Sequence, residues 1–274
     1  MKLYMSVDME GITGLPDHTF VDSQLHNYER ARRIMTNEAN DVIESAYQNG
    51  CDYVLVNDSH SKMNNILVDE LYPDADLISG GVKPYSMVEG LDDSFDGVVF
   101  LGYHARAGHP GVMSHSMTFG VRNFFINDVA VGELGFNAYV AGYYGVPVIL
   151  VGGDDQATEE AKEIIPNIIT APVKQTITRS AVKTLTPKKS SKLLREKTIQ
   201  AMEQITQIEP LIPPEKPTLR IEFTNYGQAE WAHLMPKTEI EPHSCIVKFE
   251  AEDILEAYRA MIVMTELAMQ TKFC

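Results

Sequence analysis

Apolar and polar positions follow two different rhythms along the first half of the chain. Short apolar runs at residues 3–7, 53–56, 98–101 and 147–151 are typical of buried β-strands. Between the first two runs, residues 25–49 carry apolar side chains at helical spacing, and Asn49-Gly50 follows as a helix stop. Strands that alternate with helices are joined by parallel crossovers, so the pattern predicts a sheet covered by helices on both faces.

A hairpin pattern interrupts this alternation. The segment FFINDVAVGE is expected to turn at Asn127-Asp128, and the helix-like segment LGFNAYVAGYYG follows it. Because a hairpin joins antiparallel strands, the sequence favours a mixed sheet over a purely parallel one. The chain contains no internal repeat and no low-complexity tract.

The character of the chain changes after about residue 165. Thr186-Pro187 offers an N-cap and a proline at the first helical position, which predicts a basic amphipathic helix to about residue 205. The proline-rich connector EPLIPPEKP ends that helix. The apolar pattern then predicts two strands and a closing Met-rich helix, at residues 218–223, 245–249 and about 252–269. The apolar face of the last helix has two interpretations, core or a subunit interface, and we expect core.

These elements predict an α/β protein with a mixed, mainly parallel sheet covered by helices. Residues 1–165 would form the α/β domain, and residues 166–274 a smaller α+β C-terminal subdomain packed on it. A chain of 274 residues is long enough to bury a core without disulfides or a structural metal. A metal ion in this protein would therefore serve chemistry rather than stability.

The charge balance is strongly acidic, with 38 Asp and Glu against 23 Lys and Arg and a formal net charge of −15. Such a surface repels phosphate backbones and anionic lipid, which argues against nucleic acid and membranes as partners. We interpret the basic segment KKSSKLLREK as a solvated helix face. Most of the acidic charge serves solubility, and a minor part fits a carboxylate-rich cation site.

The cysteines and the apolar segments indicate a compartment. Cys51, Cys245 and Cys274 are odd in number and form no CxxC pair, which fits a reducing compartment and argues against a thiolate zinc site. No apolar stretch approaches the ~20 residues that a membrane helix requires. Asp8 and Glu10 interrupt the first apolar run before it reaches the length of a signal sequence. We expect a cytoplasmic protein.

Side chains that can bind a metal follow the predicted strands. The strand ends read DMEG after the first strand, NDSH after the second, GYH after the third, and GE after the hairpin. In open α/β sheets, ligands bind at the carboxyl ends of strands, where the loops converge. The pattern therefore predicts one site that gathers Asp8, Glu10, His60, His104 and Glu133.

The pair Asp8 and Glu10 has the spacing of two ligands on one site. Residues i and i+2 of an extended chain point to the same side. Two carboxylates that close raise each other's pKa unless a cation neutralises them. A DxE sequence by itself is as readily a solvated turn, but its position directly after a buried strand favours a site. Gly11 would let the backbone turn sharply away.

His60 and His104 each follow an apolar strand, and neutral imidazole is the commonest zinc ligand. A single histidine in such a loop is more often only hydrogen-bonded, whereas two histidines beside three carboxylates favour a metal site. Five nitrogen and oxygen ligands suit two ions about 3.5–4 Å apart that share a carboxylate. Asp8 is the candidate bridge because it comes first after its strand.

Three other positions have more than one interpretation. Glu133 is explained equally well as a ligand and as an acid at the N-terminus of the following helix. His115, in MSHSMTFG, is either a surface loop residue or an acid–base group. Asp154-Asp155 ends the fourth strand, and we interpret it as a helix cap or a support of the site rather than a ligand.

Five segments, in this order and spacing, resemble those of a known family: SVDMEGITG, VNDSH, GYHARAG, SHSMTFG and GELGFNA. They are similar to segments of the zinc-dependent, self-compartmentalising D-aminopeptidases. The resemblance extends over essentially the whole chain. The S-x-D-x-E-G signature of that family is present without departure at residues 6–11.

The resemblance implies a ligand assignment for two zinc ions per subunit. Asp8 would bridge both ions. Glu10 and His104 would complete the coordination of one ion, and His60 and Glu133 that of the other.

The resemblance also implies an activity and an assembly. His115 would be the catalytic residue, which the family assigns as a nucleophile. The substrates would be short peptides from which N-terminal D-residues, notably D-alanine, are removed. The implied particle is a homodecamer that encloses its active sites around an internal channel.

The residues themselves predict metal-assisted hydrolysis by an activated water. His115 would stabilise the oxyanion or protonate the departing amine, so its role as nucleophile, acid–base group or oxyanion stabiliser stays open. Two other functions also stay open, namely a two-metal phosphoesterase and a non-catalytic metal- or solute-binding module. Gly80-Gly81 with Lys83 is the nearest candidate for a phosphate cradle and is more simply a turn.

Overall fold

A computed structural model of the chain describes residues 1–272. Its larger sheet has seven strands, of which six are parallel and the last pairs antiparallel at the edge. In spatial order these are β3 (Asp76–Ile78), β2 (Tyr53–Asp58), β1 (Lys2–Val7), β4 (Gly97–Tyr103), β7 (Val148–Asp154), β8 (Ile169–Thr178) and β9 (Ala181–Thr184). The predicted α/β class and the mixed, mainly parallel sheet are therefore confirmed.

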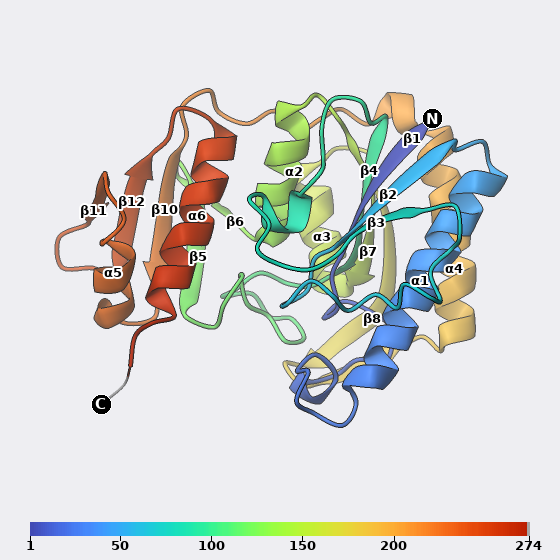
Figure 1. The fold of residues 1–274 in the computed structure, drawn as a ribbon, viewed down its shortest axis with the longest axis horizontal. Coiled ribbons are helices and arrows are strands. Elements are labelled where there is room, and N and C mark those ends of the chain that lie inside the picture. The colour runs from blue at the N-terminus through green and yellow to red at the C-terminus, as the bar shows by residue number, and fades with distance from the viewer. Residues whose placement is uncertain (273–274) are drawn as a thin grey trace.

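Helices cover both faces of this sheet, as Figure 1 shows. One face carries α1 (Tyr28–Gln48) and α4 (Pro187–Glu203), which pack on each other, and the other face carries α2 (Glu133–Tyr143) and α3 (Asp155–Ile164). Every residue of β4 and β7 is buried, which explains why these strands read as continuous apolar runs. As predicted, Pro187 is the first residue of α4 after the N-cap Thr186.

A second, antiparallel sheet stands beside the first. Its five strands are β11 (Thr238–Ile240), β12 (Ile246–Glu250), β10 (Thr218–Phe223), β5 (Val121–Ile126) and β6 (Val129–Val131), in that order. The helices α5 (Tyr226–Ala232) and α6 (Ile254–Ala268) pack on β10 and β12. Alternate residues of β10 are buried, as expected of a sheet with one covered face. The apolar face of α6 is core, as predicted.

Each of the two sheets contains segments from both sides of residue 165. The predicted hairpin, with its turn at Asn127-Asp128, is present as β5 and β6 but belongs to the second sheet. Conversely, two strands of the first sheet, β8 and β9, come after residue 165. The helix α4 also comes after residue 165 and packs on that sheet. The pairing of β5 with β10 joins segments almost a hundred positions apart, and no local pattern reports such a pairing. The division into domains 1–165 and 166–274 stays a prediction.

Short 3-10 helices complete the fold at His18–Phe20 (η1), Ser86–Val88 (η2) and Ile205–Gln207 (η3). None of the helices within residues 1–272 combines the length and the apolar composition that a membrane span requires. Cys51 and Cys245 carry free thiols, and Cys274 lies outside the described residues.

Candidate metal centre

Three neighbouring parallel strands deliver the first candidate ligands to one edge of the large sheet. β1 lies between β2 and β4, and Val7 is paired with Asp58 on one side and Leu101 on the other. The loops that follow these strands therefore start at the same level. They bring together four of the predicted side chains, those of Asp8, Glu10, His60 and His104.

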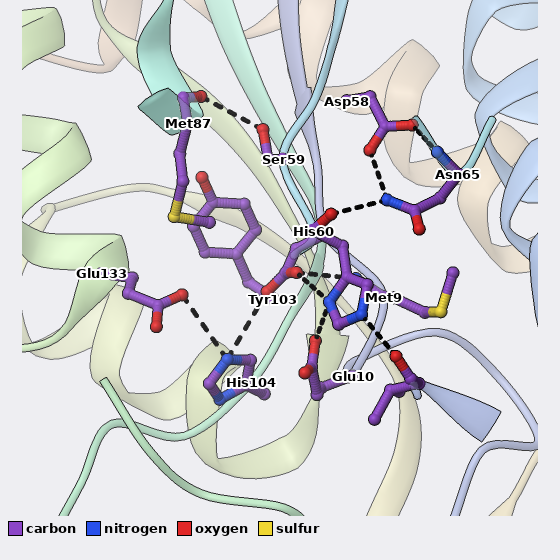
Figure 2. A network of polar contacts seen from close by, with 12 residues as sticks. Met9, Glu10, Asp58, Ser59, His60, Asn65, Met87, Tyr103, His104 and Glu133 are labelled. Carbon is purple, nitrogen blue, oxygen red and sulfur yellow. Dashed lines mark hydrogen bonds and ion pairs between the residues drawn. The ribbon is translucent and has the colours of Figure 1, made fainter. Parts of the chain in front are cut away.

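Asp8 lies between the two histidines. Its Oδ1 is 3.5 Å from His60 Nδ1, and its Oδ2 is 3.5 Å from His104 Nε2. Glu10 approaches His60 more closely, with 3.0 Å between its Oε2 and Nδ1, and Figure 2 shows this contact. A carboxylate with one oxygen toward each imidazole has the disposition of a bridging ligand.

Glu133 reaches the same cluster from the second sheet. It is the first residue of α2, directly after β6 and the N-cap Gly132. Its Oε1 accepts a hydrogen bond from the backbone N–H of Met117, and its Oε2 lies 3.5 Å from His104 Nε2 (Figure 2). The two interpretations of Glu133 thus meet in one place, since an acid in the first turn of a helix also faces the cluster.

His115 lies at the mouth of the cluster. Its ring stacks on that of His104, with 4.3 Å between centroids and 6° between planes. Its Nε2 is 3.9 Å from Glu10 Oε1. Burial and the neighbouring charge of His104 lower the pKa of His115. The structure thus brings all six predicted site residues together.

Each of the three imidazoles has one nitrogen held by a backbone carbonyl. The pairs are His60 Nε2 with Val21 O at 2.8 Å, His104 Nδ1 with Ala105 O at 2.9 Å, and His115 Nδ1 with Met113 O at 2.9 Å. A carbonyl only accepts, so we assign the N–H of each neutral ring to that side. The other nitrogen, with its lone pair, then faces the carboxylates, which is the tautomer of a metal-ligating histidine.

The carboxylates of the cluster need positive charge. Burial and the charge of Glu10 raise the pKa of Asp8 to about 7. Burial alone would lower the pKa of His60 and of His104, but the acidic neighbours raise both well above the ordinary value. With the ring N–H groups on the carbonyl side, Asp8 Oδ2 and Glu10 Oε2 are buried and receive no hydrogen bond from any described residue, although His60 Nδ1 lies only 3.0 Å from Glu10 Oε2. Since unpaired buried oxygens are costly, the arrangement suits a bound cation.

The donor set agrees with zinc. Asp8, Glu10 and His104 offer three ligand atoms within 4.8 Å of one another, and so do His104, His115 and Glu133. Carboxylate oxygen and imidazole nitrogen suit zinc, although manganese and cobalt accept them too. The first set is one of the two zinc sites that the family resemblance implies, whereas the pairing of His60 with Glu133 stays a prediction.

Two glycines allow the close approach of the first and third strand ends. Gly11 N donates to Gly102 O at 2.7 Å, and a Cβ on Gly11 would lie 2.0 Å from Tyr103 O. Gly102 has φ of +74°, and a Cβ there would lie 2.0 Å from Asp8 O. The turn predicted at Gly11 is present, since Ile12 N donates to Met9 O at 3.0 Å, and the close approach of the two backbones is what requires glycine there.

Hydrogen bonds of Asp58 and Asn65 fix the loop that carries His60. Asp58 accepts hydrogen bonds from the backbone N–H groups of Asn65 and Ile66, and Asn65 donates to His60 O at 2.7 Å (Figure 2). Lys83 is buried and donates to Asn57 Oδ1 and Asp58 O, both at 2.6 Å. Lys83 therefore supports the end of β2, which argues against the phosphate cradle considered from the sequence.

Lys174 stabilises the loop that carries Glu10. The sequence did not identify this residue. Its side chain is buried, with 2% of the residue exposed, and Nζ donates to three backbone carbonyls of one loop, those of Glu10, Ile12 and Leu15. Burial lowers its pKa to about 8. The sequence offers only one signal, a lysine within the strand-like segment ITAPVKQTIT. The structure shows that this position is buried.

Asp154 also agrees with its predicted role. It is the N-cap of α3, and its carboxylate accepts hydrogen bonds from Ala157 N at 2.7 Å and Ala105 N at 3.2 Å. It therefore ties the helix to the residue after His104 rather than contacting the cluster.

Comparison with known proteins agrees with this geometry. A solved structure described as the Zn-dependent D-aminopeptidase DppA from Bacillus subtilis, a self-compartmentalizing protease, superposes with a TM-score of 0.99 at 68% identity over 100% of both chains. A D-aminopeptidase of Bacillus subtilis (strain 168) is 68% identical over 274 residues, which is 100% of each chain. The family model Peptidase_M55, described as D-aminopeptidase, matches residues 1–263. The chain belongs to the M55 family of D-aminopeptidases.

Proposed function

We propose that the protein is a zinc-dependent D-aminopeptidase that releases N-terminal D-residues, notably D-alanine, from short peptides. Asp8, Glu10, His60, His104 and Glu133 would hold two zinc ions, with Asp8 as the bridge. The observation that carries this proposal is the orientation of the imidazoles: His60 and His104 each have one nitrogen on a backbone carbonyl and the other facing the buried carboxylates. Two ions in such a site would polarise the scissile carbonyl and acidify a water.

His115 would be the residue that handles the proton. Its Nδ1 is engaged by Met113 O, so Nε2 is the nitrogen available to a substrate. That nitrogen lies on the same side of the ring as Glu10 Oε1, next to the proposed ions. We propose that the lone pair of Nε2 first accepts a proton from the attacking water, and that the imidazolium then donates this proton to the departing amine or stabilises the oxyanion. A metal-activated water makes an acyl-imidazole intermediate unnecessary.

We further propose that the protein is cytoplasmic and works as a self-compartmentalising homo-oligomer, a decamer with an internal channel. The relative of known structure is itself described as self-compartmentalizing. Large apolar side chains are exposed on α5, α6 and the turns that end them, including Trp231, Leu234, Val263 and Met269. Such side chains suit contacts between subunits. Light scattering on the purified protein would measure the particle mass.

Family membership favours a peptidase over a phosphoesterase or a non-catalytic binding module. The test compares hydrolysis of D-Ala-D-Ala and L-Ala-L-Ala before chelation, after chelation and after zinc restoration. We expect chelator-sensitive release of D-alanine, recovery with zinc, and little cleavage of the L-peptide. Absence of cleavage with zinc or other divalent metals present would reject the peptidase, and turnover of phosphate esters instead would support the phosphoesterase.

A further inference from the structure

A cleft of about 420 Å³ opens directly beside His115. Its walls carry Arg122, Arg179 and His109 and, within residues 1–272, no acidic side chain. The whole chain has a formal net charge of −15, so this local balance is the reverse of the overall one. A concave surface lined by arginines next to a reaction centre is suited to the anionic part of a ligand.

The two arginines differ in how their charge is matched. Arg122 Nη1 lies 3.4 Å from Glu222 Oε1, so its charge already has a partner. Arg179 forms no ion pair with any described residue. Arg179 is therefore the cation of the cleft whose charge is left for a ligand.

Arg179 is also held in place. Its Nη2 donates to Ser114 O at 3.2 Å, and its Cζ lies 5.5 Å from the centre of the Phe119 ring. Its own carbonyl accepts from Met113 N at 2.9 Å. These contacts use one edge of the guanidinium and leave other N–H groups available for a carboxylate, which arginine binds in a bidentate manner. An arginine that is already ordered loses less entropy when it binds.

Aromatic rings connect Arg179 to the reaction centre. His104 stacks on His115, and the His115 ring lies 5.0 Å from that of Phe119, on which Arg179 rests. Phe119 is 68% exposed, so it offers an apolar surface between the cluster and the cation. One residue of an extended peptide spans about 3.5 Å. The steps of 5.0 Å from His115 to Phe119 and 5.5 Å from Phe119 to Arg179 therefore suit a short peptide, with few residues beyond the scissile bond.

We propose that Arg179 binds the C-terminal carboxylate of the substrate and so selects short peptides with a free carboxyl end. This inference rests on the proposed peptidase function and adds the group that recognises the far end of the substrate. Phe119 forms the apolar floor under the last side chain. The metal cluster holds the end that reacts, and Arg179 holds the end that leaves.

The test uses the full-length zinc enzyme with two substrates, D-Ala-D-Ala and its C-terminal amide. Both are assayed with the wild type, Arg179→Gln and the control Arg259→Gln. Arg259 is also exposed and also stacks on an aromatic ring, with its Cζ 5.8 Å from the ring centre of Tyr85, but lies on α6 outside the cleft. We expect Arg179→Gln to raise KM for the free acid about 10- to 100-fold, the value of a charge-assisted hydrogen-bond pair.

The amide is the internal reference. In the wild type, KM for the amide should exceed KM for the acid. KM for the amide should not change in Arg179→Gln. Arg259→Gln should leave KM for both substrates unchanged. Equal KM values for acid and amide in the wild type would overturn the assignment, although cleavage itself would still support the proposed function. A parallel rise for both substrates in Arg179→Gln would overturn it as well, since it would mean a displaced His115 loop. Cleavage of neither substrate would reject the proposed function and this inference with it.

Discussion

The metal cluster and the cleft meet at His115 but have opposite composition. The cluster consists of buried carboxylates and imidazoles, and two of its carboxylate oxygens have no hydrogen-bond donor among the described residues. The cleft carries arginines and is open to solvent. The first arrangement suits cations and the second suits an anion, so the net charge of −15 describes neither. Local sets of side chains, rather than composition, determine what each region can bind.

His115 belongs to both regions, and its replacement would have the largest effect on the comparison. We expect His115→Gln to reduce kcat about 10²- to 10⁴-fold, the usual contribution of an acid–base group. Zinc content should stay at the wild-type value, because His115 is not one of the five proposed ligands. Steady-state kinetics and metal analysis on the same preparation would measure both. A proportional loss of zinc would instead make His115 a ligand.

Lys174 is the support on which the cluster depends and the cleft does not. Lys174→Met would leave three buried carbonyls without their donor, and we expect unfolding free energy to fall by about 3–5 kcal/mol. Zinc affinity should fall too, because the loop that carries Glu10 loses its anchor. Chemical denaturation and zinc titration would measure the two effects. Lys183→Met, at an exposed position of β9, is the control.

Loss of stability with unchanged zinc affinity would contradict the account of Lys174. The lysine would then serve the fold alone, and the position of Glu10 would depend on other contacts.

Glu38 tests whether burial alone places a carboxylate in a metal site. It is 3% exposed, and neither of its oxygens forms a hydrogen bond of good geometry within residues 1–272. Unlike Asp8 and Glu10, it does not belong to any group of potential metal ligands among those residues. Burial raises its pKa to about 7 from the ordinary 4.5.

The raised pKa of Glu38 gives stability a defined pH dependence. The folded state binds the proton more tightly than the unfolded state, so this contribution is complete below pH 4.5 and is lost as the pH rises through about 7. We expect Glu38→Gln to raise the unfolding free energy at pH 8 by roughly 1–3 kcal/mol, with less effect at pH 5. Thermal melts at both pH values would measure it. Glu29→Gln, at an exposed position of the same helix, is the control and should leave the melting temperature unchanged at both pH values. If Glu38→Gln shifted the melting temperature equally at both pH values, the pKa of Glu38 would not be the cause.

The sequence predicted the ligand-bearing edge because the edge is built from local patterns. Each of β1, β2 and β4 is a short apolar run, and the residue types after it are visible in the sequence. Parallel neighbours must place those residues together. The contact of Glu133 with His104 does not follow from a local pattern, because it depends on a hairpin that belongs to the other sheet.

The parts that the sequence could not predict depend on long-range contacts. The pairing of β5 with β10 decides which sheet the hairpin joins, and no periodicity encodes it. In the sequence Lys174 is an ordinary strand lysine, and its role depends on the hydrogen bond from its Nζ to Glu10 O in a distant loop. The role of Arg179 depends on its contacts with Ser114 and Phe119, which lie sixty or more positions away in the sequence.

We propose that Asp8 lies between two zinc ions. The most direct measurement is anomalous X-ray scattering at the zinc absorption edge, from crystals of the wild type and of Asp8→Asn. We expect two peaks about 3.5–4 Å apart in the wild type, with one oxygen of Asp8 toward each, and loss of at least one peak in the variant. A single peak in the wild type, or two peaks that persist in Asp8→Asn, would contradict it.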